Sequence, residues 1–312
     1  MNYIKEINTL KKEKKAIILA HYYQVPEVQE IADFVGDSLA LSQKASKSDA
    51  EIIVFAGVHF MAETAKIINK NCKVLLPDLE AGCSLADSCP ADQFKKFIHE
   101  NPGYKVISYI NCSAEVKALS DVICTSSNAV QVVESFPKDQ KIIFAPDKNL
   151  GNYVNSVTGR NMLLWDGACH VHEKFSLEKI LALKKENPQA QIIAHPECKK
   201  PILIVSDFVG STHELLNYVK KDKGKTYIVV TESGILHEMK KQNPEKTFIP
   251  APPEDSTCAC SNCEFMKKIT LEKIYESLRD EKFEIVLDEE IRKKSEIPIR
   301  RMLEISANQM KK

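Results

Sequence analysis

Three cysteines far apart in the sequence are the strongest candidate metal ligands in the chain. Cys83, Cys169 and Cys263 each follow a short apolar run and lie in a loop. Three thiolates from equivalent positions, with no fourth, favour a [4Fe–4S] cluster over a structural zinc site, which four ligands normally close. In such a cluster one iron has no protein thiolate and can act as a Lewis acid on a substrate oxygen or nitrogen.

The other cysteines have less defined roles. Cys258 and Cys260 lie close to Cys263, and this dense group alone fits zinc about as well as an iron–sulfur cluster. Either of the two could replace Cys263 as a ligand, or both could form a redox-sensitive dithiol. The remaining cysteines are expected to have no ligand role: Cys72, Cys89, Cys112, Cys124 and Cys198.

Polar residues recur at fixed spacing in three stretches, each of which begins with a short apolar run. In each stretch an aspartate lies twelve residues after the first polar residue, and a hydroxyl residue lies five residues after the aspartate. The equivalent sets are His21, Tyr109 and His195; Tyr23, Asn111 and Glu197; Asp33, Asp121 and Asp207; and Ser38, Ser126 and Thr212. We expect the aspartates to cap helices, and the hydroxyl residues at helix starts to attract carboxylate or phosphate.

Two residues, Glu197 of the repeat sets and His172 outside them, are candidates for acid–base chemistry. Glu197 is the natural general base if burial raises its pKa, although a surface carboxylate fits the sequence equally well. His172 lies three residues after Cys169 and is therefore expected beside the metal site, where it could transfer protons.

A repeated pattern of strands and helices must position these residues. Each stretch is followed by a second β-rich run, near residues 52, 142 and 227, and by a third run that leads into a cysteine loop. Strands that alternate with helices predict parallel sheets with helices on both faces, in which ligands bind outside the carboxyl ends of the strands. We therefore predict an α/β fold of three αβα (Rossmann-like) domains, related by a pseudo-threefold axis around a central active site. The predicted domains are residues 1–88, 89–174 and 175–269, with residues 270–312 packing back on the first and completing it.

The composition narrows the function classes. The 43 basic and 43 acidic side chains cancel, so no net field favours nucleic acid or an anionic membrane. No GxGxxG or Walker sequence is present, so no motif of the sequence indicates nucleotide binding. The N-terminal residues read as a charged helix rather than a signal peptide, and no run is long enough to span a bilayer. We expect a cytoplasmic protein, in which thiols stay reduced and serve as ligands or nucleophiles.

Several short motifs together resemble those of the quinolinate synthase A family, and the resemblance covers nearly the whole chain. The motifs are Ala20-His21-Tyr22-Tyr23-Gln24, Gly36-Asp37-Ser38, Tyr109-Ile110-Asn111, Thr125-Ser126-Ser127-Asn128, Cys169-His170-Val171-His172, Ala194-His195-Pro196-Glu197-Cys198, Gly210-Ser211-Thr212 and Cys263-Glu264-Phe265-Met266. The resemblance implies a triangle of three αβα domains with a [4Fe–4S] cluster at its centre. It also implies a transferase of NAD biosynthesis, which condenses iminoaspartate with dihydroxyacetone phosphate to give quinolinate, phosphate and water.

The resemblance assigns roles to individual residues. Cys83, Cys169 and Cys263 would hold the cluster, and Tyr23, His172 and Glu197 would be the catalytic residues that transfer protons. The substrate pocket would be lined by His21, Ser38, Tyr109, Asn111, Ser126, His195, Glu197 and Thr212. The partners would be the two small-molecule substrates, with a transient link to the enzyme that supplies iminoaspartate.

One departure from the family concerns the last cysteines. Many members have C-x-x-C-x-x-C before an aromatic–Met pair, whereas here the spacing is Cys258-x-Cys260-x-x-Cys263. The final cysteine keeps its place before Phe265 and Met266, so it remains the expected ligand. The shortened spacing leaves the roles of Cys258 and Cys260 open.

A second function class is a non-catalytic iron–sulfur or zinc protein that senses redox state or binds a metabolite. A sensor does not need polar residues at all three strand ends, and a structural zinc needs a fourth ligand. Both considerations favour the enzyme.

Overall fold

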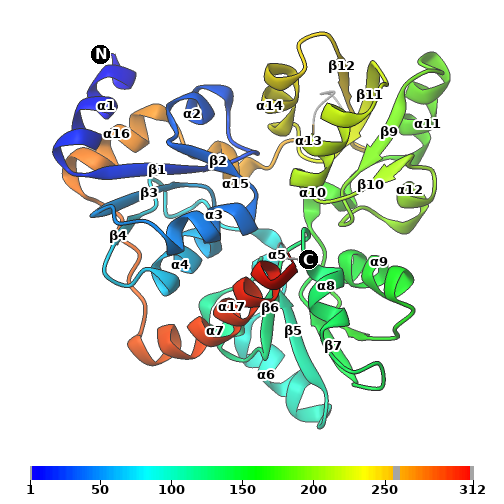
Figure 1. The fold of residues 1–312 in the computed structure, drawn as a ribbon, viewed down its shortest axis with the longest axis horizontal. Coiled ribbons are helices and arrows are strands. Elements are labelled where there is room, and N and C mark those ends of the chain that lie inside the picture. Colours follow the sequence, from blue (N-terminus) through cyan, green and yellow to red (C-terminus); the bar gives the residue numbers. More distant parts are fainter. Residues whose placement is uncertain (1, 256–260, 310–312) are drawn as a thin grey trace.

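The computed structural model describes residues 2–255 and 261–309. Cys258 and Cys260 lie outside the described residues. Three four-stranded sheets, each covered by helices, occupy three corners of the molecule (Figure 1). The predicted α/β class with three αβα units is therefore confirmed, while the domain boundaries stay a prediction. We refer to each sheet with its helices as the first, second or third part.

The three sheets have the same strand order. The first contains β1 (Ala16–His21), β2 (Phe34–Gly36), β3 (Ile52–Ala56) and β4 (Lys73–Leu75), in the order β2-β1-β3-β4. The second contains β5 (Lys105–Tyr109), β6 (Val122–Cys124), β7 (Ile142–Ala145) and β8 (Leu163–Leu164), in the order β6-β5-β7-β8. The third contains β9 (Gln191–Ala194), β10 (Phe208–Val209), β11 (Thr226–Val230) and β12 (Thr247–Pro250), in the order β10-β9-β11-β12. The threefold repeat of the sequence is thus a repeat of the fold.

The pairing of the strands explains where polar residues gather. Every pair of neighbouring strands within the three sheets is parallel. The inner strands are apolar and buried, as in β3, because helices cover both faces of a parallel sheet. Parallel strands end at one edge, so the polar residues that follow β1, β5 and β9 lie at the carboxyl edges of their sheets.

Seventeen helices surround the sheets in the described part of the chain. They are α1 (Tyr3–Glu13), α2 (Pro26–Ile31), α3 (Ser38–Ser46), α4 (His59–Ile68), α5 (Ser84–Asp87), α6 (Ala91–Glu100), α7 (Ala114–Ala118), α8 (Ala129–Glu134), α9 (Lys148–Thr158), α10 (His170–Glu173), α11 (Leu177–Glu186), α12 (Lys200–Ile204), α13 (Thr212–Lys221), α14 (Ile235–Gln242), α15 (Glu264–Lys267), α16 (Leu271–Asp280) and α17 (Glu289–Gln309).

The repeat aspartates fasten the connection between the first two strands of each sheet. Each carboxylate Oδ2 accepts the backbone N–H of a residue in the first strand, and each aspartate N–H donates to the carbonyl of that same residue. The pairs are Asp33 with Ile18, Asp121 with Val106 and Asp207 with Ile192, with N···Oδ2 distances of 2.7, 2.8 and 2.7 Å. The expectation that these aspartates cap helices is therefore wrong, and the caps of α3 and α13 are Asp37 and Ser211.

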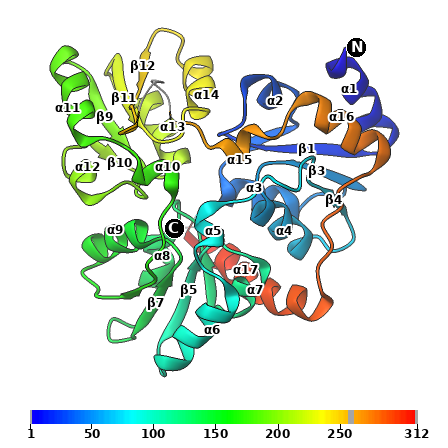
Figure 2. The same cartoon turned by 180° about the vertical axis from the view of Figure 1, so that it is seen from behind.

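The two last helices pack on different parts of the molecule. α16 packs against α1 beside the first sheet, whereas α17 packs against α4 of the first part and against α7, α8 and β6 of the second. Figure 2 shows α17 from behind, between these two parts. Arg292 of α17 donates to the carbonyl of Ile67 at 3.2 Å, and Asn128 donates to the hydroxyl of Ser306 at 2.9 Å. α17 therefore joins the first part to the second.

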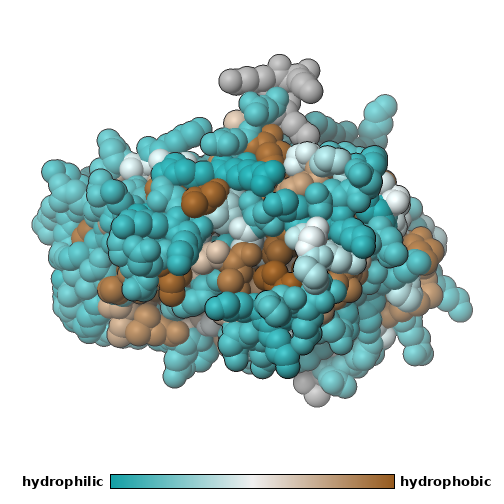
Figure 3. All heavy atoms as spheres, turned by 90° about the horizontal axis from the view of Figure 1, so that it is seen from below, coloured by the Kyte–Doolittle hydropathy of each residue, from teal (hydrophilic) through white to brown (hydrophobic). Residues whose placement is uncertain are grey.

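The surface shows no single dominant apolar patch on the face drawn in Figure 3. That face is mostly hydrophilic, and its hydrophobic residues lie in separate groups, as is normal for a protein surface. Within residues 2–255 and 261–309, the structure contains no helix whose length and hydropathy would let it cross a bilayer.

Replacing Asp207 with alanine tests the link between strands. The substitution leaves the buried N–H of Ile192 without its acceptor, so we expect the free energy of unfolding to fall by about 1–3 kcal/mol. The control is Asp139→Ala, which changes an exposed aspartate in a turn and should cost less than about 0.5 kcal/mol. Urea unfolding followed by circular dichroism measures both variants, and equal midpoints would contradict the role of Asp207.

Candidate active site

One cavity receives side chains from all three parts. It contains about 690 Å³ of space between its atoms, part of it open to solvent. Every site residue predicted from the sequence lines this cavity: His21, Tyr23, Ser38, Cys83, Tyr109, Asn111, Ser126, Cys169, His172, His195, Glu197, Thr212 and Cys263. The fold thus brings together residues that are up to 242 positions apart in the chain, from 21 to 263.

Three short helices carry the cysteines to this cavity. Cys83, Cys169 and Cys263 are the N-cap residues of α5, α10 and α15, each of which is four residues long. In each loop the N–H of the fourth residue after the cysteine donates to the cysteine carbonyl, at 2.9, 2.9 and 3.2 Å. The helices lie near the centre of the molecule in Figure 1. The same local structure therefore presents one sulfur from each of three loops.

The surroundings of the three thiols suit a cationic metal centre. Burial raises the pKa of Cys83 to about 12 and that of Cys263 to about 11, and it also raises the pKa of Cys169. Negative charge on a neighbouring thiolate adds to the effect, from Cys263 on Cys83 and from Cys83 on Cys169. Three thiolates in one enclosed space repel each other unless a cation lies among them. All three cysteines are free of disulfides, so they can serve as ligands.

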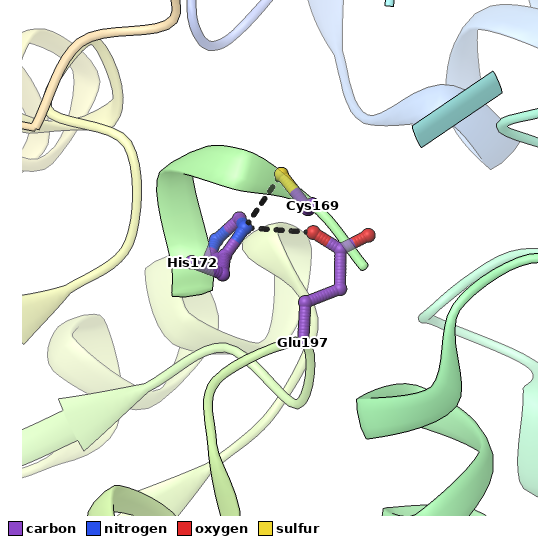
Figure 4. Close-up of side chains that lie close together, drawn as sticks. All are labelled: Cys169, His172 and Glu197. Atoms are coloured by element: carbon purple, nitrogen blue, oxygen red, sulfur yellow. Dashed lines mark hydrogen bonds and ion pairs between the residues drawn. The ribbon is translucent and has the colours of Figure 1, made fainter. Parts of the chain in front are cut away.

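His172 connects Cys169 to a buried carboxylate. The Nδ1 atom of His172 lies 2.8 Å from Oε2 of Glu197 and 3.3 Å from the sulfur of Cys169 (Figure 4). The three groups offer donor atoms within 4.8 Å of one another, so they could also hold a single metal ion. The geometry alone therefore leaves a zinc ion as a second interpretation of this corner of the cavity.

A chain of hydrogen bonds leads from His172 to Tyr23. The Nε2 atom of His172 lies 3.0 Å from the hydroxyl of Thr231, which lies 2.7 Å from the hydroxyl of Tyr23. The Tyr23 hydroxyl is also 3.2 Å from that of Thr212. Glu197, His172, Thr231 and Tyr23 thus form one continuous path for protons. The sequence gives no signal for Thr231, because a single threonine after a strand belongs to no motif.

The pKa of Glu197 differs from the raised value that the base hypothesis requires. Burial pushes the pKa of Glu197 upward, but the charges of His172 and His195, with hydrogen bonds from His172 and Tyr109, outweigh burial and hold it at about 2. Glu197 is therefore a carboxylate at neutral pH and a weak base. Its position suits it to orient His172 and to stabilise a proton on that imidazole.

The two repeat histidines are neutral hydrogen-bonding groups. Burial lowers the pKa of His21 and of His195 to about 3. The Nδ1 atom of each ring accepts a backbone N–H two residues later, from Tyr23 at 3.1 Å and from Glu197 at 3.3 Å. The proton of each neutral ring is therefore on Nε2, which is left as a donor for a ligand.

The hydroxyl residues are placed at or before helix starts without serving as caps. Ser38 and Thr212 are the first residues of α3 and α13, while Asp37 and Ser211 accept the N–H groups of the first turn. Ser126 lies three residues before α8. Because other residues cap α3 and α13, the hydroxyls of Ser38 and Thr212 are available to the cavity that they line.

Comparison with known proteins gives matches over nearly the whole chain. The family described as Quinolinate synthetase A protein matches residues 5–304. A quinolinate synthase of Thermosynechococcus vestitus is 59% identical over 306 residues, which cover 98% of this chain and 96% of that protein. A quinolinate synthase of Chloroherpeton thalassium is 57% identical over 306 residues, which cover 98% of this chain and 95% of that protein. The similarity thus includes all three sheets and all three cysteine loops.

The low pKa of His21 predicts a loss of stability in mild acid. The unfolded chain binds a proton at His21 near the ordinary pKa of 6.5, whereas the folded protein does so only near 3. The unfolded state therefore binds more protons between these values, and stability falls as the pH drops through this range. In the metal-free protein, His21→Gln should reduce the fall in unfolding free energy between pH 7 and pH 5 by about 2 kcal/mol.

The control for this measurement is His213→Gln, which replaces an exposed histidine and should keep the wild-type dependence on pH. Urea unfolding at several pH values between 7 and 5 gives the slope for each variant. Identical slopes for wild type and His21→Gln would show that His21 is not buried in its neutral form.

Proposed function

The chain belongs to the quinolinate synthetase A protein family, and on this basis we propose that it condenses iminoaspartate with dihydroxyacetone phosphate to give quinolinate, phosphate and water. The observation that carries the proposal is the single cavity to which three cysteines and a set of polar residues from all three parts contribute. A non-catalytic sensor or metabolite-binding protein is not favoured, because the relatives that match over the whole chain carry the name of an enzyme.

We assign a [4Fe–4S] cluster to Cys83, Cys169 and Cys263. The assignment is supported by the donor set itself, which consists of three free thiols from equivalent loops in a space where thiolates need a neighbouring cation. When bound, the cluster supplies an iron without a protein thiolate, which acts as a Lewis acid on a substrate oxygen or nitrogen.

The polar residues of the cavity are suited to two anionic substrates. Ser38, Ser126 and Thr212 lie at or before helix starts, where backbone amides attract carboxylate and phosphate groups. His21 and His195 donate from Nε2 as neutral rings. They therefore leave no uncompensated positive charge in the cavity when the product leaves. Asn111, Tyr109 and the two histidines line the same cavity, which supports a role for them as further hydrogen-bonding groups for the substrates.

The proton transfers follow the hydrogen-bonded path. Glu197 accepts the Nδ1 proton of His172 and so leaves Nε2 of that imidazole free to take up a proton. Burial raises the pKa of Tyr23, so its hydroxyl is protonated at rest and acts as the acid. A proton given up by Tyr23 is replaced through Thr231 from His172. In this scheme His172 is the base and Glu197 its partner.

The setting of the reaction completes the proposal. The protein is a transferase of NAD biosynthesis that works in the cytoplasm, where thiol ligands stay reduced before the cluster forms. Iminoaspartate is the product of a preceding enzyme, with which a transient association is expected.

Replacing Cys83 with serine tests the cluster. The wild type, purified without oxygen, should contain about four irons and four sulfides per chain and form quinolinate. Cys83→Ser should lose most of the iron and the activity, because one of three ligands is gone. The control is Cys72→Ser, whose hydroxyl can donate, as the buried thiol does, to the carbonyl of Glu51 or of Lys73. Stoichiometric zinc without iron in the wild type would instead support a zinc site at Cys169, His172 and Glu197.

Replacing Glu197 with glutamine tests the carboxylate. The amide cannot stabilise a proton on His172, so we expect kcat to fall by roughly 10²- to 10⁴-fold while the iron content stays at the wild-type level. Steady-state assays with iron analysis measure both quantities. Full activity in this variant would refute a role for Glu197 in proton transfer.

A further inference from the structure

Each cysteine loop is bound to the segment that follows an inner strand by the same backbone hydrogen bond. The donor is the N–H of the third residue after β3, β7 or β11, and the acceptor is the carbonyl two residues before the cysteine. The pairs are His59 with Ala81 at 2.7 Å, Lys148 with Gly167 at 2.8 Å and Ser233 with Ser261 at 3.1 Å. The three loops therefore start from equivalent anchors.

In two of the loops a buried carboxylate adds a second anchor. Asp147 and Glu232 precede the donor residue of their loops and are almost completely buried. Oδ2 of Asp147 accepts the backbone N–H of Cys169, and Oε1 of Glu232 accepts that of Cys263, both at 3.2 Å. An aspartate and a glutamate thus make the same bond to two cysteines from different parts of the chain.

The second oxygen of each carboxylate binds the start of the next helix. Oδ1 of Asp147 accepts the N–H of Leu150 in α9, and Oε2 of Glu232 accepts the N–H of Gly234 before α14, both at 2.7 Å. Binding a helix start alone needs only one acceptor, which serine, threonine or asparagine also provides. A carboxylate offers two acceptor oxygens, and here each oxygen binds a different N–H group.

Glu232 also connects its loop to the first part. Its Oε1 atom lies 2.9 Å from the ammonium of Lys267, which donates to the backbone carbonyl of Tyr23 at 2.6 Å. Asp147 belongs to the same part as Cys169 and has no need of such a link. The two carboxylates therefore share the contact to a cysteine amide, and this contact is their common feature.

The loop of Cys83 lacks this anchor. The residue equivalent to Asp147 and Glu232 is Val58, two positions after β3. Within residues 2–255 and 261–309, the structure gives no hydrogen-bond acceptor for the N–H of Cys83. The three loops share one backbone geometry but differ in whether the N–H of the cysteine is hydrogen-bonded.

We propose that Asp147 and Glu232 are positioning residues for the cluster ligands. By binding the amides of Cys169 and Cys263 they fix the orientation of these two thiols and keep the amides from donating to cluster sulfur. Hydrogen bonds to the sulfurs are one of the determinants of cluster potential. The amide of Cys83 alone stays free to make such a bond. This inference depends on the proposed assignment of the three cysteines as ligands.

The first experiment measures amide hydrogen exchange in the metal-free protein, resolved to single residues. In the wild type the Cys83 amide should exchange at least about tenfold faster than those of Cys169 and Cys263, because only the latter two are hydrogen-bonded. Among the three cysteine amides, Asp147→Asn should accelerate exchange only at Cys169, because the amide group keeps one acceptor and the bond to Cys169, at 3.2 Å against 2.7 Å for Leu150, is the longer one. Glu232→Gln should do the same at Cys263.

The second experiment measures iron loss from the loaded protein to a chelator. We expect Asp147→Asn and Glu232→Gln to lose iron about tenfold faster than the wild type, as is typical when a partner of a metal ligand is changed. The matched control is Asp121→Asn, which weakens an equivalent carboxylate bond to the backbone N–H of Val106 in the second part. The control should exchange its cysteine amides and lose its iron at wild-type rates.

The outcomes separate this inference from the proposed function. Faster exchange at the cysteine amides with an unchanged rate of iron loss would mean that the two carboxylates only stabilise helix starts, which overturns the inference. A wild type that binds no iron would overturn the proposed function, whereas the exchange rates would still report on the hydrogen bonds. If a variant does not fold, the exchange rates of the three cysteine amides in the wild type still test the inference. A Cys83 amide that exchanges as slowly as the other two would overturn it.

Discussion

A parallel sheet offers binding groups at only one of its edges, and the rest of this structure depends on how three such edges are combined. The carboxyl ends of the strands carry the residues that follow β1, β5 and β9, and side chains from all three sets line one cavity. One sheet alone would leave these residues in an open crevice. Three sheets enclose them, so each polar group must find a partner in the protein or in a ligand. The repeated bonds between loops and strands satisfy many backbone groups, whereas Oδ1 of Asn111 and Oε1 of Glu197 are buried without a protein hydrogen-bond partner among the described residues.

Enclosure also determines the charges in the cavity. An imidazole that loses contact with water tends to become neutral, and at both His21 and His195 burial outweighs the charge of the nearby Glu197 and lowers the pKa. Glu197 keeps its negative charge because the imidazole of His172 and the hydrogen bonds that the carboxylate accepts outweigh the effect of burial. The three thiols stay protonated for the same reason that the histidines stay neutral, until a cation binds. Glu197 is thus an anion at the position from which it can act on His172.

The repeat in the sequence predicted most of this arrangement. Equal spacing of His21, Tyr109 and His195 from their aspartates required equal loops, and equal loops required equivalent sheets. The sequence could not predict the net pKa of Glu197, because burial and two histidines oppose each other and only distances decide which prevails. Nor could it identify Thr231, whose role comes from two partners in other segments. The aspartates were assigned to caps because spacing does not distinguish an N–H in a helix from one in a strand.

The position of α17 has a consequence for the order of events during synthesis. This helix follows every strand of the three sheets in the chain, yet it packs between the first and second parts. A ribosome adds about 5–20 residues per second, and domains usually fold as they emerge. The first two sheets therefore have time to form while the third is still being made, but they reach their final arrangement only when α17 arrives. A cofactor held by all three loops can therefore be bound only after the third part, with Cys263, has been made.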